Sequence, residues 1–114
     1  MKALLLSLML MSSAAMAQDM ITCKYDGSQI EMNACAVWDY NAADSVLNQE
    51  YQKTLERLDD PGRDKLRAEQ REWIKRRDAR CKPKRIGNGS NSTIEYYTCM
   101  QNFTEIRSLQ LKTW

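Results

Sequence analysis

The sequence contains no histidine, and this absence removes the commonest general base and the commonest zinc ligand of proteins. It also has no glycine-rich phosphate loop and no C-x-x-C pair, so neither a nucleotide site nor a zinc cluster or thioredoxin-like redox centre is indicated. A glycosidase that used carboxylates alone would need a deep cleft, which nothing in so small a chain suggests. We therefore expect no catalytic residue, no metal and no cofactor, and a protein that binds a partner without turning it over.

The start of the chain has the pattern of a secretory signal. Lys2 precedes an apolar run over residues 3–11, and small residues follow, ending in A-M-A at 15–17. These features predict a cleavable signal peptide over residues 1–17, because the apolar run is too short to remain as a membrane anchor. The remaining residues, 18–114, are expected to form a single domain that is periplasmic or secreted.

All four cysteines lie after the predicted signal peptide. An even number of cysteines in a small exported chain predicts two disulfides, and four cysteines allow three pairings. The spacing alone does not choose between them. We favour the local pairing, Cys23 with Cys35 and Cys81 with Cys99, because the second bond would close the connection 82–98. A loop of that size contributes about 3 kcal/mol in the chain-entropy model.

The charge of the mature chain is nearly balanced. Without Lys2 it has sixteen basic and fifteen acidic residues, a net charge of +1. This balance gives no electrostatic reason to expect nucleic acid or an anionic membrane surface as a partner.

Two stretches of apolar periodicity are separated by a clear turn. Ser28 and Glu31 match a capping box, which opens a first helix that can run to about Leu58. The turn D-D-P-G follows at residues 59–62, where Asp60 is the expected cap of the second helix.

The second helix is predicted to run to about Cys81, since Pro83 disfavours continuation. A loop follows, and a second capping box at Ser92 and Glu95 opens a third helix that runs to about Leu111. The sequence thus predicts an all-α fold. It is a small three-helix bundle in which a long first helix packs with an antiparallel second helix and a third helix, stapled by two disulfides.

The second helix carries polar residues in the middle of its apolar face. At 100° per residue, Gln70 and Arg77 share one narrow face with Leu66, Trp73 and Cys81. A guanidinium in an apolar seam is costly unless it is paired and hydrogen-bonded. Arg77 should therefore find a polar partner elsewhere in the chain.

Counting outward from the turn at residue 60 gives a register for the helices. It places Asp44 opposite Arg77, and it places Arg107 near Asn48 if Cys81 and Cys99 lie level. We expect a structural polar seam formed by Asp44, Asn48, Gln70, Arg77 and Arg107. The alternative is that these residues line a ligand site, but buried polar groups usually satisfy one another, which favours the structural role.

Two features are candidates for contact with a partner. Trp38 faces away from the apolar stripe of the first helix, and the segment 18–27 could cover it if Cys23 pairs with Cys35. We expect such cover, because tryptophan is usually buried, whereas an exposed Trp38 would be a binding hot spot. The second candidate is the basic loop 82–90, with Lys84 and Arg85.

Several short motifs follow one another over nearly the whole mature chain. They are E-M-N-A-C-A at 31–36, Ala43-Asp44, Leu47-Asn48, Tyr51, Leu66-Arg67, Gln70, Trp73-Ile74, Arg77-Asp78, Cys81, Cys99, Thr104 and Arg107. In this order they resemble the N-terminal domain family of the lysozyme inhibitor LprI. The resemblance implies a small exported bacterial helical domain with two disulfides that inhibits lysozyme by stoichiometric protein binding.

The expected partner is therefore another exported protein. Many lysozymes are strongly basic, and an inhibitor usually offers acidic complementarity, of which a net charge of +1 offers little. Two alternatives stay open: an immunity-type partner of a secreted effector, and an accessory protein of the bacterial envelope with a purely structural role.

Overall fold

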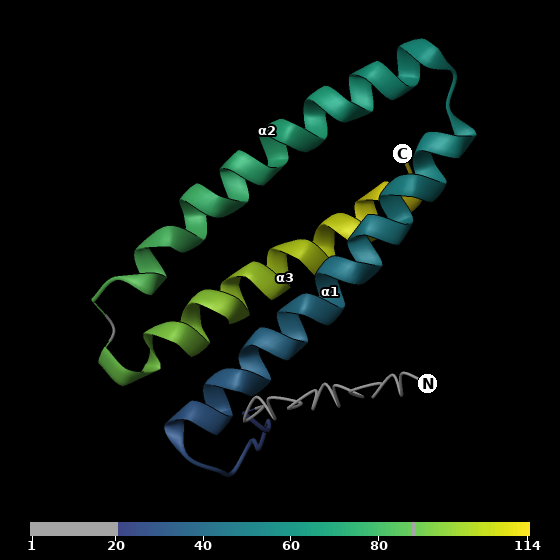
Figure 1. The fold of residues 1–114 in the computed structure, drawn as a ribbon. Coiled ribbons are helices and arrows are strands. Elements are labelled where there is room, and N and C mark those ends of the chain that lie inside the picture. The colour runs from purple at the N-terminus through teal and green to yellow at the C-terminus, as the bar shows by residue number, and fades with distance from the viewer. Residues whose placement is uncertain (1–20, 88) are drawn as a thin grey trace, which may run out of the picture.

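The computed structural model describes residues 21–87 and 89–114, which form three helices and no strand (Figure 1). The elements are α1 (Gln29–Arg57), α2 (Asp60–Arg85), a short 3₁₀ turn η1 (Gly89–Asn91) and α3 (Ser92–Lys112). The predicted all-α three-helix fold is confirmed. The predicted signal peptide, residues 1–17, lies outside the described residues.

The capping box at the start of α1 is confirmed. The Ser28 hydroxyl accepts a hydrogen bond from the Glu31 backbone N–H at 3.3 Å, and the Glu31 carboxylate accepts one from the Ser28 N–H at 3.1 Å. The predicted cap of α2 is wrong by one position. Asp59 is the cap, because its carboxylate accepts from the N–H of Gly62 at 2.9 Å, the third residue of the helix. Asp60 is already helical.

The other end of α2 differs from the prediction, because the helix continues through Pro83 to Arg85. Contacts with α3 hold this last turn in place. The guanidinium of Arg85 lies 5.0 Å from the ring of Tyr96, and Cys81 is bonded to α3 just before the proline. Lys84 and Arg85 therefore lie on a helix and not in a loop.

The predicted capping box of α3 is wrong. An N-cap residue normally has extended backbone, but Asn91 has φ −90° and ψ 0° and makes no side-chain cap bond. The 3₁₀ turn η1 directly precedes Ser92, so the backbone is already helical where α3 begins.

α3 packs along both of the other helices, whereas α1 and α2 touch each other little (Figure 1). Two contacts show that α1 and α3 run parallel in one register. Thr54 donates a hydrogen bond to the carbonyl of Leu111, and the rings of Tyr40 and Tyr97 lie 5.7 Å apart, so both contacts join residues 57 positions apart. α2 runs antiparallel to α3, as its disulfide and side-chain contacts show.

The apolar core receives residues from all three helices. It consists of Leu47, Leu55, Leu66, Trp73 and Leu111, with Tyr51, Leu58 and Phe103 packed against it. The carbonyl of Leu111 is also bound by Thr54 and Arg57, which satisfies an acceptor in the last turn of α3. Ile106 of α3 lies outside this core and is exposed.

Candidate functional site

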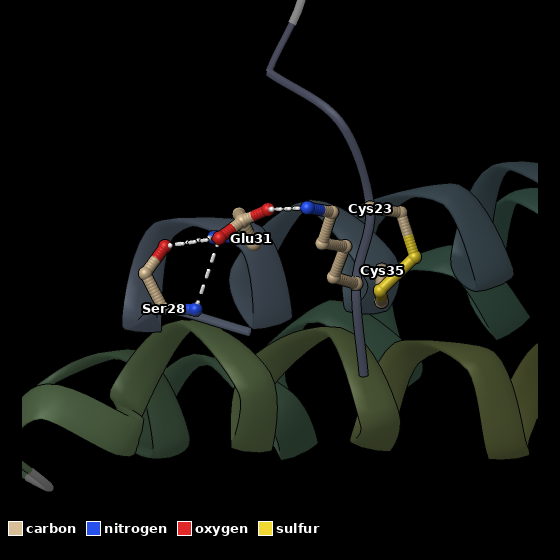
Figure 2. A network of polar contacts seen from close by, with 5 residues as sticks. Cys23, Ser28, Glu31 and Cys35 are labelled. Atoms are coloured by element: carbon tan, nitrogen blue, oxygen red, sulfur yellow. Dashed lines mark hydrogen bonds and ion pairs between the residues drawn. A yellow bond between two sulfur atoms is a disulfide. The ribbon is translucent and has the colours of Figure 1, made fainter. Parts of the chain in front are cut away.

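The segment before α1 is tied back onto the helix at several points. A disulfide joins Cys23 to Cys35, and Lys24 lies 3.6 Å from the Glu31 carboxylate, next to the capping box (Figure 2). Hydrogen bonds from the backbone and hydroxyl of Ser28 hold the pKa of Glu31 below its usual value. This end of the molecule is therefore fixed by covalent, ionic and cap contacts together.

The second disulfide joins α2 to α3 between Cys81 and Cys99, whose Cα atoms are 5.7 Å apart. Cys81 is fully buried. The favoured local pairing of the four cysteines is confirmed in both bonds.

Trp38 is 54% exposed, so the expected cover by the segment before α1 is wrong. The hydroxyl of Tyr25 donates a hydrogen bond to Asp39 at 2.9 Å, and this bond raises the pKa of Tyr25. Cys35 and Asp39 are four residues apart, so they draw the segment to one side of α1. Trp38 points about a quarter of a turn away from Asp39 and stays in contact with solvent.

The structure places three of the five predicted seam residues in the interior: Gln70, Arg77 and Arg107. Asp44 and Asn48 do not belong to the seam. Asp44 is half-buried and Asn48 is exposed, and the Asn48 amide donates to the Asp44 carboxylate at 3.4 Å. The predicted register counted α1 directly against α2, but α3 mediates most of the packing between them.

Arg77 is 8% exposed and finds its partners on α2 and α3. Its Nε and Nη2 contact the Asp78 carboxylate at 3.1 and 3.0 Å, and its Nη1 donates to the Thr104 hydroxyl at 3.3 Å. The guanidinium also lies 5.0 Å from the Trp73 ring and 5.9 Å from the Tyr40 ring. The predicted pairing of Arg77 with Asp44 is therefore wrong. Asp78, adjacent in sequence, was overlooked as a partner because register counting considers only facing helices.

Arg107 is the second buried guanidinium. Its Nε donates to the Gln70 amide oxygen at 2.9 Å, so it lies opposite Gln70 and not near Asn48 as expected. The rings of Trp73 and Trp114 flank it at 5.6 and 5.5 Å. Its Nη2 is buried without a hydrogen-bond partner within the described part of the chain, and burial lowers the pKa of Arg107. These contacts hold both guanidinium groups in the interior of the bundle.

A groove that the sequence did not reveal runs between α1 and α3. It has a volume of about 440 Å³, and its lining is mostly apolar, with Ala42 and Val46 from α1 and Leu109 from α3. The carboxylates of Asp39 and Glu105 also line it. Trp38, Ala42 and Val46 follow at intervals of four residues and so share one side of α1. That spacing was the one signal in the sequence that could have pointed to this surface.

Charge is divided unevenly between the helices. α2 carries eleven basic and five acidic residues, whereas α1 carries two basic and five acidic residues. The small net charge of the chain thus conceals a basic helix and an acidic one. An electrostatic argument from net charge alone misses this separation.

Within residues 21–87 and 89–114, no helix has the length and apolar character needed to cross a membrane. The same residues contain no group of three or more acidic or cysteine side chains placed to hold a metal ion.

The comparisons with known proteins agree with the motifs. The family model of the lysozyme inhibitor LprI matches residues 20–111, which include all three helices almost completely and both disulfides. No curated protein and no solved structure matches the chain.

Proposed function

Because the chain belongs to the lysozyme inhibitor LprI family, we propose that it is an exported protein that inhibits a lysozyme by binding it stoichiometrically. The observation that carries the proposal is the family match over residues 20–111. No chemical step is needed for such a role, which accords with a sequence that has no histidine.

The architecture supports a binding role because it is rigid. One disulfide fixes the start of α1 and the other fixes α2 to α3. A surface held in one conformation loses little entropy when a partner binds, so more of the contact energy is left for affinity. The exposed Trp38 lies on this rigid frame, and tryptophan is among the residues that contribute most to protein interfaces.

We propose Trp38 as a contact residue, with Lys84 and Arg85 at the end of α2 as a second candidate contact. The two places differ in character. Trp38 is an apolar anchor on the acidic helix, whereas Lys84 and Arg85 belong to the basic helix. Arg85 is also engaged in stacking on Tyr96, which leaves less of its guanidinium for a partner.

The proposed compartment is the periplasm or the extracellular space. The predicted signal peptide over residues 1–17 would deliver the domain there after cleavage. The two disulfides agree with this location, because such bonds persist in oxidising compartments and are rare in the bacterial cytosol.

Titration of lysozymes with the pure mature protein, residues 18–114, tests the proposal. Using lysozymes of more than one class, we expect the loss of lytic activity to saturate near an equimolar ratio for at least one of them. No loss at large excess for any of them would refute the proposal and favour an immunity-type partner. Release of soluble fragments from peptidoglycan by the protein alone would refute the hypothesis that it binds a partner without catalysing a reaction.

A further inference from the structure

We propose that the groove between α1 and α3, together with Trp38, is the surface that docks onto the cationic surface of the lysozyme. This inference rests on the proposed inhibitory function and specifies which face of the inhibitor carries it. We call this surface the α1–α3 face and define it by Trp38, Asp39, Ala42, Val46, Glu105 and Leu109.

The apolar part of the α1–α3 face is unusually accessible. Trp38 is 54% exposed, Val46 is 48% exposed and Leu109 is 63% exposed. Exposed apolar side chains are common singly, but Val46 and Leu109 line a hollow of about 440 Å³ together with Ala42. Trp38 lies four residues before Ala42, on the same side of α1. A hollow lined by a valine and a leucine, with an exposed tryptophan on the same side of α1, is suited to receive an apolar side chain or the aliphatic stem of an arginine or lysine.

The charges around the hollow identify the kind of partner. Asp39 and Glu105 contribute carboxylates from the two helices, and Lys112 is the only basic residue in the lining. Glu105 is exposed and accepts a hydrogen bond from Gln101 at 2.9 Å, while Asp39 is held by Tyr25. Two positioned carboxylates beside apolar lining residues complement a basic protein, and many lysozymes are strongly basic.

Apart from Lys112, the residues that line this groove include no basic side chain. α3 turns Cys99, Phe103 and Arg107 toward α2, as the disulfide, the stacking of Arg80 on Phe103 and the bond to Gln70 show. The groove is lined by other positions of α3, among them Glu105 and Leu109. α2 thus packs on a side of α3 that does not form the groove. Its eleven basic residues would repel a basic partner on that side.

Matched pairs of variants on exposed positions test the inference. Leu109→Lys alters the α1–α3 face, and Ile106→Lys places the same side chain on another exposed position of the same helix. Trp38→Ala removes the proposed anchor, and Ile86→Ala trims an exposed apolar residue at the end of α2. We expect Leu109→Lys and Trp38→Ala each to weaken inhibition about 30-fold or more, and the two controls to change it less than about threefold.

A second pair separates the electrostatic part. Glu105→Lys should weaken inhibition about tenfold or more and reduce its dependence on salt, whereas Glu72→Lys on α2 should do neither. Helical circular dichroism and the melting temperature of every variant serve as folding controls, since all six side chains are exposed.

The outcomes distinguish the two proposals. If wild-type protein inhibits and the variants at Leu109, Trp38 and Glu105 inhibit equally well, the α1–α3 face is not the docking surface, although the proposed function stands. If Lys84→Glu with Arg85→Glu abolishes inhibition and the α1–α3 variants do not, the partner binds the end of α2 instead. If wild-type protein inhibits no lysozyme, the proposed function itself fails.

Discussion

Replacing Arg77 by alanine is the most direct test of how the bundle is held together. The Arg77 side chain contacts residues of all three helices. It belongs to α2, donates to Thr104 on α3 and stacks on Tyr40 of α1 as well as on Trp73 of its own helix. Its removal should therefore loosen contacts between all three helices.

The expected loss follows from the individual contacts. Stacking on two aromatic rings contributes about 1–2 kcal/mol when the cation is largely desolvated, and the bond to Thr104 contributes about 1 kcal/mol. The ion pair with Asp78 adds at most about 1 kcal/mol, because the Asp78 side chain is 52% exposed and water can solvate it after the change. We expect Arg77→Ala to lower the free energy of unfolding by about 2–4 kcal/mol. This is less than the about 3–5 kcal/mol expected when the abandoned partner stays buried.

Thermal or denaturant unfolding followed by circular dichroism measures this loss. For a domain of this size, it corresponds to a melting temperature lower by about 10–25 °C. Arg71→Ala, an exposed position on the same helix, is the control and should change stability by no more than about 0.5 kcal/mol. Arg77→Lys should fall between the two, because lysine keeps the charge but not the planar stacking surface. Equal midpoints for the alanine variants at 71 and 77 would refute the structural role of Arg77.

Two further predictions concern other fixed points of the fold. Replacing Cys81 and Cys99 together by serine should lower stability by about 3 kcal/mol, measured by denaturant unfolding, and an unchanged midpoint would contradict the role of this staple. The pKa of Tyr25 is raised by its bond to Asp39, so the stability from this bond is fully present below about pH 10 and is lost as the pH rises through the folded-state pKa. The melting temperature of wild-type protein should therefore fall toward that of Tyr25→Phe as the pH rises above about 10, and a constant difference would contradict the assignment.

The sequence allowed the helices and the disulfides to be predicted because their determinants are local. Ser28 and Glu31 specify the start of α1 through contacts within one turn, and the D-D-P-G turn separates α1 from α2. The errors at helix ends arose where tertiary contacts outweigh local preference. Pro83 is accommodated in α2 because Arg85 and Cys81 anchor the last turn on α3.

The arrangement of the helices was harder to predict because it is decided by packing between distant segments. The D-D-P-G turn at residues 59–62 indicated that the first two helices form an antiparallel hairpin, and counting outward from residue 60 led to Asp44 as the partner of Arg77. In the structure α3 packs against both other helices. Its small side chains Thr104 and Ser108 are buried. Apolar periodicity predicts which face of a helix is buried. It does not predict which of the other helices packs against that face.

The electrostatic conclusion changes when the fold is taken into account. A net charge of +1 argues against attraction to a basic enzyme only if the charges are spread evenly. Here the helices divide them, and the α1–α3 face keeps Asp39 and Glu105 while the excess of arginine and lysine is carried by α2. Because exposed charges more than about 8 Å apart are largely screened at physiological ionic strength, a partner at this face interacts mainly with the local carboxylates. A weakly basic protein can therefore present an acidic docking surface. Here that surface is the α1–α3 face, which includes Trp38.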